Sequence, residues 1–192
     1  MLLKVYGEGR PYRLFAAGMH GGEWKDTSSL LLKLNPPLSG SLFLLPLVDR
    51  GRYLSTLQEG YYKGPGSKIP VFVNNCAPEI YIEIHSYSKQ NFHKLAGGDR
   101  ISRTGVPPYS VLEDGLLLGS VSPHIRLHFP KEALCLSLEV QRENPASYEL
   151  ALHMLDRMKE CRGRDDFIDF LEKKYPSAAL KAIEDYKKFY GL

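Results

Sequence analysis

A histidine and a glutamate three positions apart, His20 and Glu23, are the first residues whose types suggest chemistry. They lie on a glycine-rich turn between an apolar run at 13–17 and a helical pattern at 26–33. Glycine lets the backbone reverse sharply there. An imidazole nitrogen and a carboxylate held on one turn suit a divalent metal such as zinc. Taken alone, the same two residues could form a salt-linked pair on a surface turn.

A second histidine, His85, lies in a segment that alternates as a half-buried strand does. In residues 79–85 the isoleucines face one way, and Tyr81, Glu83 and His85 face the other. By itself His85 could be a strand histidine with an ordinary hydrogen bond. Glu83 could orient a metal ligand through a hydrogen bond without binding the metal itself, but a solvated or paired strand glutamate is the simpler interpretation.

A carboxylate interrupts another apolar run. Glu139 lies within residues 134–140, where an ionised side chain is costly unless it is paired or functional. One alternative is a salt bridge to a neighbour such as Arg142 or Arg126. The other is a catalytic carboxylate.

The elements that must position these residues alternate along the chain. Strands are expected at 2–6, 12–17, 41–48, 70–74, 79–85, 115–121, 125–129 and 133–140, and helices at 26–34, 144–161, 166–174 and 177–190. Polar, glycine-containing segments at 49–70 and 89–108 are expected to be long loops, the first with room for one helical turn. This order predicts an α/β fold, a single-domain mixed β-sheet flanked by helices.

The predicted strand ends suggest one shared site. His20, Asp49, His85 and Glu139 all fall at or near the carboxyl end of an expected strand. Sites in open α/β sheets cluster at that edge. The sequence therefore predicts that these side chains lie close together.

Length and composition limit the other possibilities. The 192 residues fit one domain, 1–192, in which 163–192 would be a C-terminal helical extension. A net charge of +3, with the lysines and arginines spread along the chain, argues against nucleic acid as a partner. Neither a signal peptide nor an apolar run of about 18 residues is evident. With three scattered cysteines, we expect free thiols, a cytoplasmic protein and no membrane association. The oligomeric state is open.

Three short segments resemble the zinc carboxypeptidases of the carboxypeptidase A type. Residues 18–24, Gly-Met-His-Gly-Gly-Glu-Trp, are similar to that family's first metal motif, Gly-x-His-x-x-Glu-Trp. Residues 84–88, Ile-His-Ser-Tyr-Ser, resemble the segment around its third metal ligand, and 136–140 resemble the strand with its catalytic glutamate. The short intervals resemble compact relatives near the succinylglutamate desuccinylase and aspartoacylase branch. The chain is also similar to an uncharacterised protein family of methanogenic archaea.

The resemblance implies a carboxypeptidase-like (phosphorylase/hydrolase-like) fold and a set of roles. His20, Glu23 and His85 would hold Zn²⁺, Glu139 would be the general base and then the general acid, and Tyr87 would line the substrate site. This suits the chemistry, because two neutral ligands and one charged ligand leave the ion positive enough to activate water.

The sequence departs from that family where peptide specificity is determined. Gly22 replaces the arginine between the first two ligands, and the Asn-Arg pair that holds a peptide carboxylate has no evident match. Arg50 and Arg52, which follow an expected strand, are the candidates to stabilise an oxyanion or to hold a substrate carboxylate. Arg103, in a short basic cluster, could attract an anionic substrate or could lie in a solvated loop.

Two functions follow from these residues. The first is a zinc-dependent hydrolase of an amide bond in a peptide or an N-acyl amino acid. The second is a non-catalytic, metal-binding or metal-free binding module in a larger assembly, with the aromatic loop 53–62 and the charged C-terminal helices as contact surfaces. The two differ in where the Glu139 carboxylate points, because hydrolysis needs it beside the metal ligands.

Overall fold

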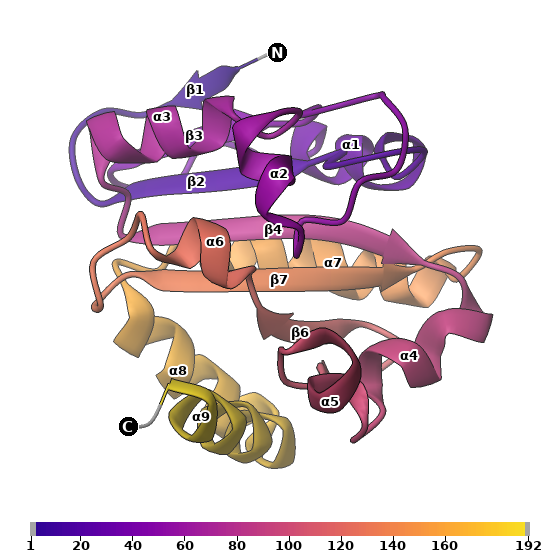
Figure 1. Ribbon diagram of the computed structural model, residues 1–192. Helices are drawn as coiled ribbons and strands as arrows, with labels where there is room; N and C mark the ends of the chain where they lie inside the picture. The colour runs from indigo at the N-terminus through magenta and orange to yellow at the C-terminus, as the bar shows by residue number, and fades with distance from the viewer. Residues whose placement is uncertain (1–2, 191–192) are drawn as a thin grey trace.

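Seven strands form one mixed sheet in the computed structural model, which describes residues 3–190 (Figure 1). The spatial order is β1-β3-β2-β4-β7-β6-β5. β3, β2, β4 and β7 run parallel, whereas β1, β6 and β5 pair antiparallel with their neighbours. The strands are β1 Lys4–Tyr6, β2 Tyr12–Ala17, β3 Ser41–Leu45, β4 Ile80–Tyr87, β5 Ser110–Val111, β6 Leu117–Ser120 and β7 Leu134–Gln141. The predicted α/β fold with a mixed sheet is confirmed.

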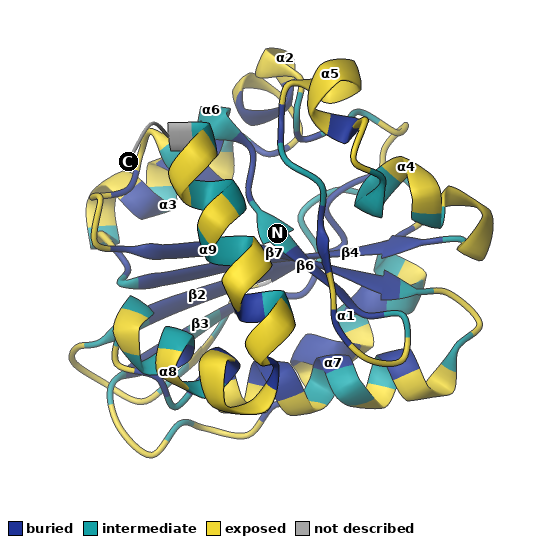
Figure 2. Ribbon diagram, turned by 90° about the horizontal axis from the view of Figure 1, so that it is seen from below, coloured by how far each residue is buried: buried dark blue, intermediate teal, exposed yellow. Residues whose placement is uncertain are grey.

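Helices cover both faces of the sheet, as parallel strands require. One face carries α1 Trp24–Leu32, α7 Pro145–Met158 and α8 Arg164–Lys174; the other carries α2 Glu59–Lys63, α3 Lys68–Cys76 and α6 Pro123–Arg126. Figure 2 shows the buried strands as a central layer between these two sets of helices. The molecule therefore has a helical layer on each side of the sheet.

Each face of the sheet has its own hydrophobic core. On the α1/α7 face, the core includes Phe15, Ile82, Leu138 and Met154. The core on the other face is richer in aromatic side chains, which include Tyr61, Tyr81 and Phe129. Every residue of β4 is buried, because this central strand has neighbours on both edges and cover on both faces. Polar side chains on β4 are therefore held in a water-poor environment.

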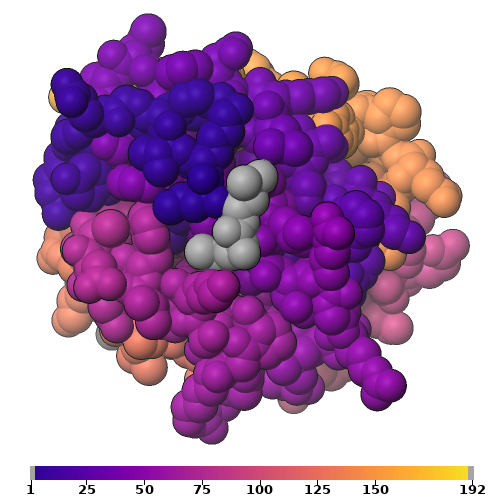
Figure 3. Space-filling view, turned by 90° about the horizontal axis from the view of Figure 1, so that it is seen from above, coloured from indigo at the N-terminus to yellow at the C-terminus, as the bar shows by residue number. Residues whose placement is uncertain are grey.

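The C-terminal helices pack against the sheet and its core. α9 Pro176–Tyr190 contacts β5, β6 and α8, and Phe167 of α8 is fully buried in the α1/α7-side core. Residues 191–192 of the expected extension, and Leu2 of the first expected strand, lie outside the described residues. At the opposite, β1 edge of the sheet, the surface is built mainly from the first half of the chain (Figure 3).

Two expected strands are wrong. Residues 70–74 lie inside α3, where Ile69, Pro70 and Val73 are buried at helical spacing and Pro70 occupies the first turn, which tolerates proline. Residues 125–129 form the end of a short helix, α6, and the turn after it. Pro123 begins this helix, and the Ser122 hydroxyl accepts a hydrogen bond from the His124 amide. In both segments a local helix signal outweighed the β-branched and aromatic composition.

The two expected loops contain short helices. The segment 49–70 holds α2, and the segment 89–108 holds η1 Lys89–Asn91, α4 Phe92–Ala96 and α5 Arg100–Thr104. Among residues 3–190, no helix combines the length and the apolar character that crossing a bilayer requires.

Candidate metal centre

The turn after β2 depends on glycine. Gly18 has a φ of +57°, a conformation that side chains other than glycine rarely adopt. A Cβ atom at Gly18 would lie 2.9 Å from the Cβ of Trp24, so a side chain there would also clash. The chain can therefore leave the strand and reach His20 within three residues only because this position is glycine.

A buried threonine fixes the same turn from the first turn of α1. The Thr27 hydroxyl accepts a hydrogen bond from the Gly18 amide at 3.0 Å and donates one to the Glu23 carbonyl oxygen at 2.9 Å. Thr27 has no exposed surface. The positions of His20 and Glu23 are thus set by hydrogen bonds that join the end of β2 to α1.

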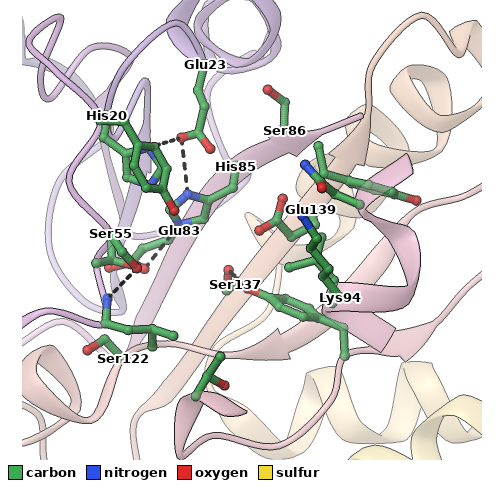
Figure 4. Close-up of a pocket in the computed structure, with 18 of the residues that line it drawn as sticks. His20, Glu23, Ser55, Glu83, His85, Ser86, Lys94, Ser122, Ser137 and Glu139 are labelled. Atoms are coloured by element: carbon green, nitrogen blue, oxygen red, sulfur yellow. Dashed lines mark hydrogen bonds and ion pairs between the residues drawn. The ribbon is translucent and has the colours of Figure 1, made fainter. Parts of the chain in front are cut away.

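Three potential metal ligands meet where β2 and β4 end (Figure 4). The Glu23 Oε2 atom lies 3.5 Å from His20 Nδ1 and 3.2 Å from His85 Nδ1. Ligand atoms of all three side chains lie within 4.8 Å of one another. His20 comes from the turn after β2, Glu23 from the start of α1 and His85 from β4. The sequence prediction that they lie together agrees with this geometry.

The chemistry of this cluster fits a metal ion. The Nδ1 atom of His20 is buried and has no hydrogen-bond partner among the described residues. A buried polar atom without a partner is costly, and a bound cation would satisfy it. Zinc at about 2.1 Å from tetrahedral ligands separates them by roughly 3.4 Å, close to the two measured distances from Glu23. His20, Glu23 and His85 could therefore hold a metal.

Electrostatics also favour a cation at this point. Burial alone would lower the pKa of His85, but the Glu23 carboxylate, the hydrogen bonds to Glu23 and Glu83, and Glu139 together raise it well above its usual value. Burial lowers the pKa of His20, with the positive charge of His85 adding to the effect and the Glu23 carboxylate opposing it, and this direction favours the neutral imidazole. Neutral imidazole beside a carboxylate is the form that binds a metal.

Glu139 lies next to the cluster on the neighbouring strand. It is the register partner of His85 in the β4–β7 pair, and it lines the same cavity (Figure 4). Its carboxylate has no hydrogen bond or ion pair within residues 3–190. The expected alternative partners are engaged elsewhere, since Arg142 pairs with Asp26 and Arg126 binds backbone carbonyls. Burial, with the nearby Glu23 charge, raises the pKa of Glu139 to about 7.

Of the two simpler interpretations of Glu83, solvated or paired, the structure shows the paired one, since Glu83 is buried and hydrogen-bonded. Its Oε1 atom accepts hydrogen bonds from the hydroxyls of Tyr62 at 2.5 Å and Tyr81 at 2.7 Å. Its Oε2 atom lies 3.5 Å from His85 Nε2. The alternation of β4 places Glu83 on the face of His85, but the tyrosine of α2 could not be foreseen from local sequence.

A cavity of about 600 Å³ opens beside the cluster. Side chains from α4, α5 and β7, and Arg142 directly after β7, complete its wall. The lysine and arginine residues of the lining are Lys94, Arg100, Arg103 and Arg142. Arg100 donates to the Pro107 carbonyl oxygen, and Arg103 pairs with Asp99. The exposed Lys94 amine has no hydrogen bond or ion pair in the described part of the chain. Sequence reasoning missed Lys94, which had no signal beyond its place in a polar segment.

Of the remaining expected site residues, two line the cavity and two do not. Tyr87 lines the cavity, but its hydroxyl donates to the Gly115 carbonyl oxygen at 2.6 Å. Arg103 lines the cavity with its guanidinium held by Asp99 at 2.7 Å. Neither Arg50 nor Arg52 is among the lining residues.

The prediction for Arg50 and Arg52 is corrected by the path of the chain after β3. β3 ends at Leu45, and the connection turns back so that the Asp49 amide donates to the Gly18 carbonyl oxygen. The Arg50 guanidinium then stacks 4.6 Å above the Trp24 ring, away from the cavity lining, and Arg52 is exposed. Tyr53 instead packs edge-on against His20, with ring centroids 4.6 Å apart.

Nearly the whole chain matches one protein family. Residues 8–191 match the family described as "Uncharacterized protein conserved in archaea (DUF2119)". An uncharacterized protein of Methanocaldococcus jannaschii is 33% identical over 190 residues, which cover 94% of this chain and 91% of that protein. The expected similarity to an archaeal family is borne out at this level.

Solved structures are more distant. The tripeptide-bound cell shape determinant Csd4 of Helicobacter pylori has a TM-score of 0.48 and 11% identity, covering 83% of this chain and 55% of that chain. A Gln46His variant of Csd4 has a TM-score of 0.33 and 16% identity, covering 46% and 28%. With TM-scores this low, the fold rests on the strand order and packing described above.

Proposed function

The chain belongs to the archaeal family described as "Uncharacterized protein conserved in archaea", and from the site that it carries we propose that it is a zinc-dependent hydrolase of an amide bond. The substrate would be a peptide or an N-acyl amino acid. One observation carries this proposal: two histidines and a glutamate converge in a buried cluster while a second glutamate lines the cavity beside it.

The ligand set supports zinc with an accessible coordination position. Three protein ligands of the types His, Glu and His are the number that catalytic zinc sites use, whereas structural sites use four. When bound, zinc would supply Lewis acidity toward a carbonyl and would activate a water for attack. The cavity beside the ligands gives both water and substrate room to approach.

Glu139 is suited to carry the proton. Its carboxylate lines the cavity and forms no ion pair with an arginine or a lysine among the described residues. A carboxylate in this position can take a proton from the attacking water and pass it to the leaving amine. Because His85 is its register partner, Glu139 is held at a fixed place relative to the ligands.

A lysine in the cavity wall favours a substrate that carries a carboxylate. Lys94 lines the cavity and has a free amine, whereas Arg103 and Arg142 are already paired with carboxylates. We assign Lys94 rather than Arg50 or Arg52 to hold a substrate carboxylate. A peptide C-terminus and an N-acyl amino acid both carry such a group.

The alternative of a non-catalytic binding module has less support. That function would be favoured if Glu139 pointed away from the cluster, but Glu139 lines the same cavity. The aromatic loop that would form its contact surface is also partly internal, since Tyr61 and Tyr62 are buried. Tyr53 is the exposed aromatic residue of that segment.

The test is a comparison of zinc-loaded wild type with the Glu139→Gln variant. The zinc-loaded protein is incubated with a panel of N-acyl amino acids and short peptides, and release of the amine is measured. We expect hydrolysis of at least one member, and a fall of kcat by about 10²–10⁴-fold in Glu139→Gln because the general base is removed.

Zinc content is measured in both proteins as the control. Glu139 is not one of the three ligands, so the variant should keep its zinc. A zinc-loaded wild type that hydrolyses no amide in the panel, or a Glu139→Gln variant with full activity, would count against the proposal.

A further inference from the structure

Glu83 is a carboxylate buried in the middle of the sheet, and its nearest basic group is the His85 imidazole. It is 1% exposed, and no lysine or arginine within residues 3–190 forms an ion pair with it. A charge in such a place is costly unless hydrogen bonds and nearby partners offset the loss of water. The fold supplies them through the hydroxyls of Tyr62, from α2, and Tyr81, from β4.

These two tyrosines determine where the carboxylate points. Both hydroxyls donate to Oε1, which leaves Oε2 directed at His85 Nε2, 3.5 Å away. The other ring nitrogen of His85, Nδ1, faces Glu23 at 3.2 Å. The imidazole of His85 is thus held between two carboxylates, one at each nitrogen (Figure 4).

The two ring nitrogens of His85 then have different tasks. A histidine that binds a metal through Nδ1 must carry its proton on Nε2. An acceptor at Nε2 fixes that tautomer and the direction of the ring, and also makes the ligand more basic. Glu83 Oε2 is the acceptor in this position, and its own orientation is fixed by Tyr62 and Tyr81.

We propose that Glu83 is a positioning residue for the metal centre, which holds His85 with Nδ1 toward Glu23 and His20 while Tyr62 and Tyr81 hold Glu83. This inference rests on the proposed metal site. It adds a link between that site and α2, because Tyr62 lies on the connection between β3 and α3. Docking of α2 on the sheet and affinity for the metal are therefore coupled.

The experiment measures metal binding rather than turnover. Zinc dissociation constants are determined by competition with a chelator, and the visible absorption of the Co²⁺-substituted protein reports the ligand geometry. The variants are Glu83→Gln and Tyr62→Phe. Glu83→Gln keeps an acceptor for the tyrosines but presents a neutral amide to His85.

Two matched controls accompany these variants. Glu79→Gln removes a carboxylate just before the same strand, where it accepts from the Tyr12 amide at 2.7 Å and lies outside the cavity lining. Tyr148→Phe removes a hydroxyl that pairs with Ser29 at 3.0 Å on the surface. Neither control contacts Glu83 or His85, so zinc affinity should stay within the error of wild type.

We expect Glu83→Gln to bind zinc about 10–100-fold more weakly than wild type and to change the Co²⁺ spectrum. Tyr62→Phe should weaken zinc binding by a smaller factor, and because it removes no buried charge it carries the test if Glu83→Gln does not fold. Wild-type zinc affinity and an unchanged Co²⁺ spectrum in a folded Glu83→Gln, or unchanged affinity in Tyr62→Phe when the glutamine variant is unfolded, would overturn the inference. A wild type that binds no zinc would instead overturn the proposed function.

Discussion

At the scale of single residues, Lys94 and Glu139 show how the same cavity holds groups of opposite charge without pairing them. Each lines the cavity, and neither side chain has a hydrogen bond or an ion pair within the described residues. Arg103 and Arg142, in the same wall, are paired with Asp99 and Asp26. Groups left unpaired in a cavity are those best able to interact with a substrate.

Replacing Lys94 by methionine tests the assignment of a substrate carboxylate. For a hydrolysed substrate with a free carboxylate, we expect KM to rise about 10–100-fold, because a charge-assisted hydrogen bond is lost. An analogue with a carboxamide in place of the carboxylate should be affected much less. Steady-state kinetics on the two compounds measures the difference.

Lys89→Met is the matched control for this substitution. Lys89 is an exposed lysine of η1, close to Lys94 in sequence but outside the cavity lining. Its removal should leave KM unchanged for both compounds. Equal KM values in wild type and Lys94→Met would show that another group holds the carboxylate.

At the scale of elements, the junction of β2 and α1 is held by one hydroxyl group. Thr27 joins Gly18 to Glu23, and both hydrogen bonds are buried. In Thr27→Val the buried Gly18 amide loses its acceptor without a large change in volume. We expect the free energy of unfolding to fall by about 1–3 kcal/mol and zinc binding to weaken, as measured by urea denaturation and chelator competition.

Ser29→Ala provides the comparison on the same helix. The Ser29 hydroxyl pairs with Tyr148 at an exposed position, so its loss should change stability by less than about 0.5 kcal/mol. If Thr27→Val were as stable as Ser29→Ala and bound zinc as tightly as wild type, the turn would not depend on this hydroxyl.

The start of α8 carries a prediction about pH. Asp166, in the first turns of the helix, accepts hydrogen bonds from the Arg162 side chain and from the Arg162 backbone amide, which lower the pKa of its carboxyl to about 2. A carboxyl with a lowered pKa stabilises the folded protein above its unfolded pKa of about 3.9 and loses that effect as the pH falls toward its folded pKa.

We therefore expect Asp166→Asn to be less stable than wild type at pH 7 by about 0.5–1 kcal/mol, a small figure because Arg162 is largely exposed. The difference should shrink as the pH falls from about 4 to about 2. Denaturation curves at several pH values measure it. Asp165→Asn, at a side chain that is 87% exposed, should show little difference at any pH; a gap for Asp166→Asn that did not close in acid would contradict the account.

At the scale of the whole molecule, the sequence predicts the sheet and the ligands because their signals are local. The glycine turn at Gly18, the alternation around His85 and the apolar run around Glu139 each mark a strand or its end within a few residues. Parallel strands then bring their carboxyl ends to one edge. The α/β fold and the convergence of the three candidate ligands follow from these features.

What the sequence does not reveal depends on contacts between distant segments. The Glu83 carboxylate accepts a hydrogen bond from the hydroxyl of Tyr62, which lies on a helix that covers the sheet. The Arg50 guanidinium stacks on the Trp24 ring and does not line the cavity. Lys94 enters the cavity through the packing of a helix, α4, that was expected to be loop. Local patterns carry no information about such pairings, so the sequence does not reveal that Lys94 lines the cavity and that Arg50 and Arg52 do not.

The metal content of the purified protein tests the central claim most directly. Wild type, His20→Ala and His85→Ala are loaded with zinc, freed of excess metal and measured by elemental analysis. His128→Ala, at an exposed histidine that contacts Asn74, serves as the matched control. The account predicts one zinc ion per chain in wild type and in the control, and none in the two ligand variants. A wild type without stoichiometric zinc, or ligand variants that keep it, would contradict the account.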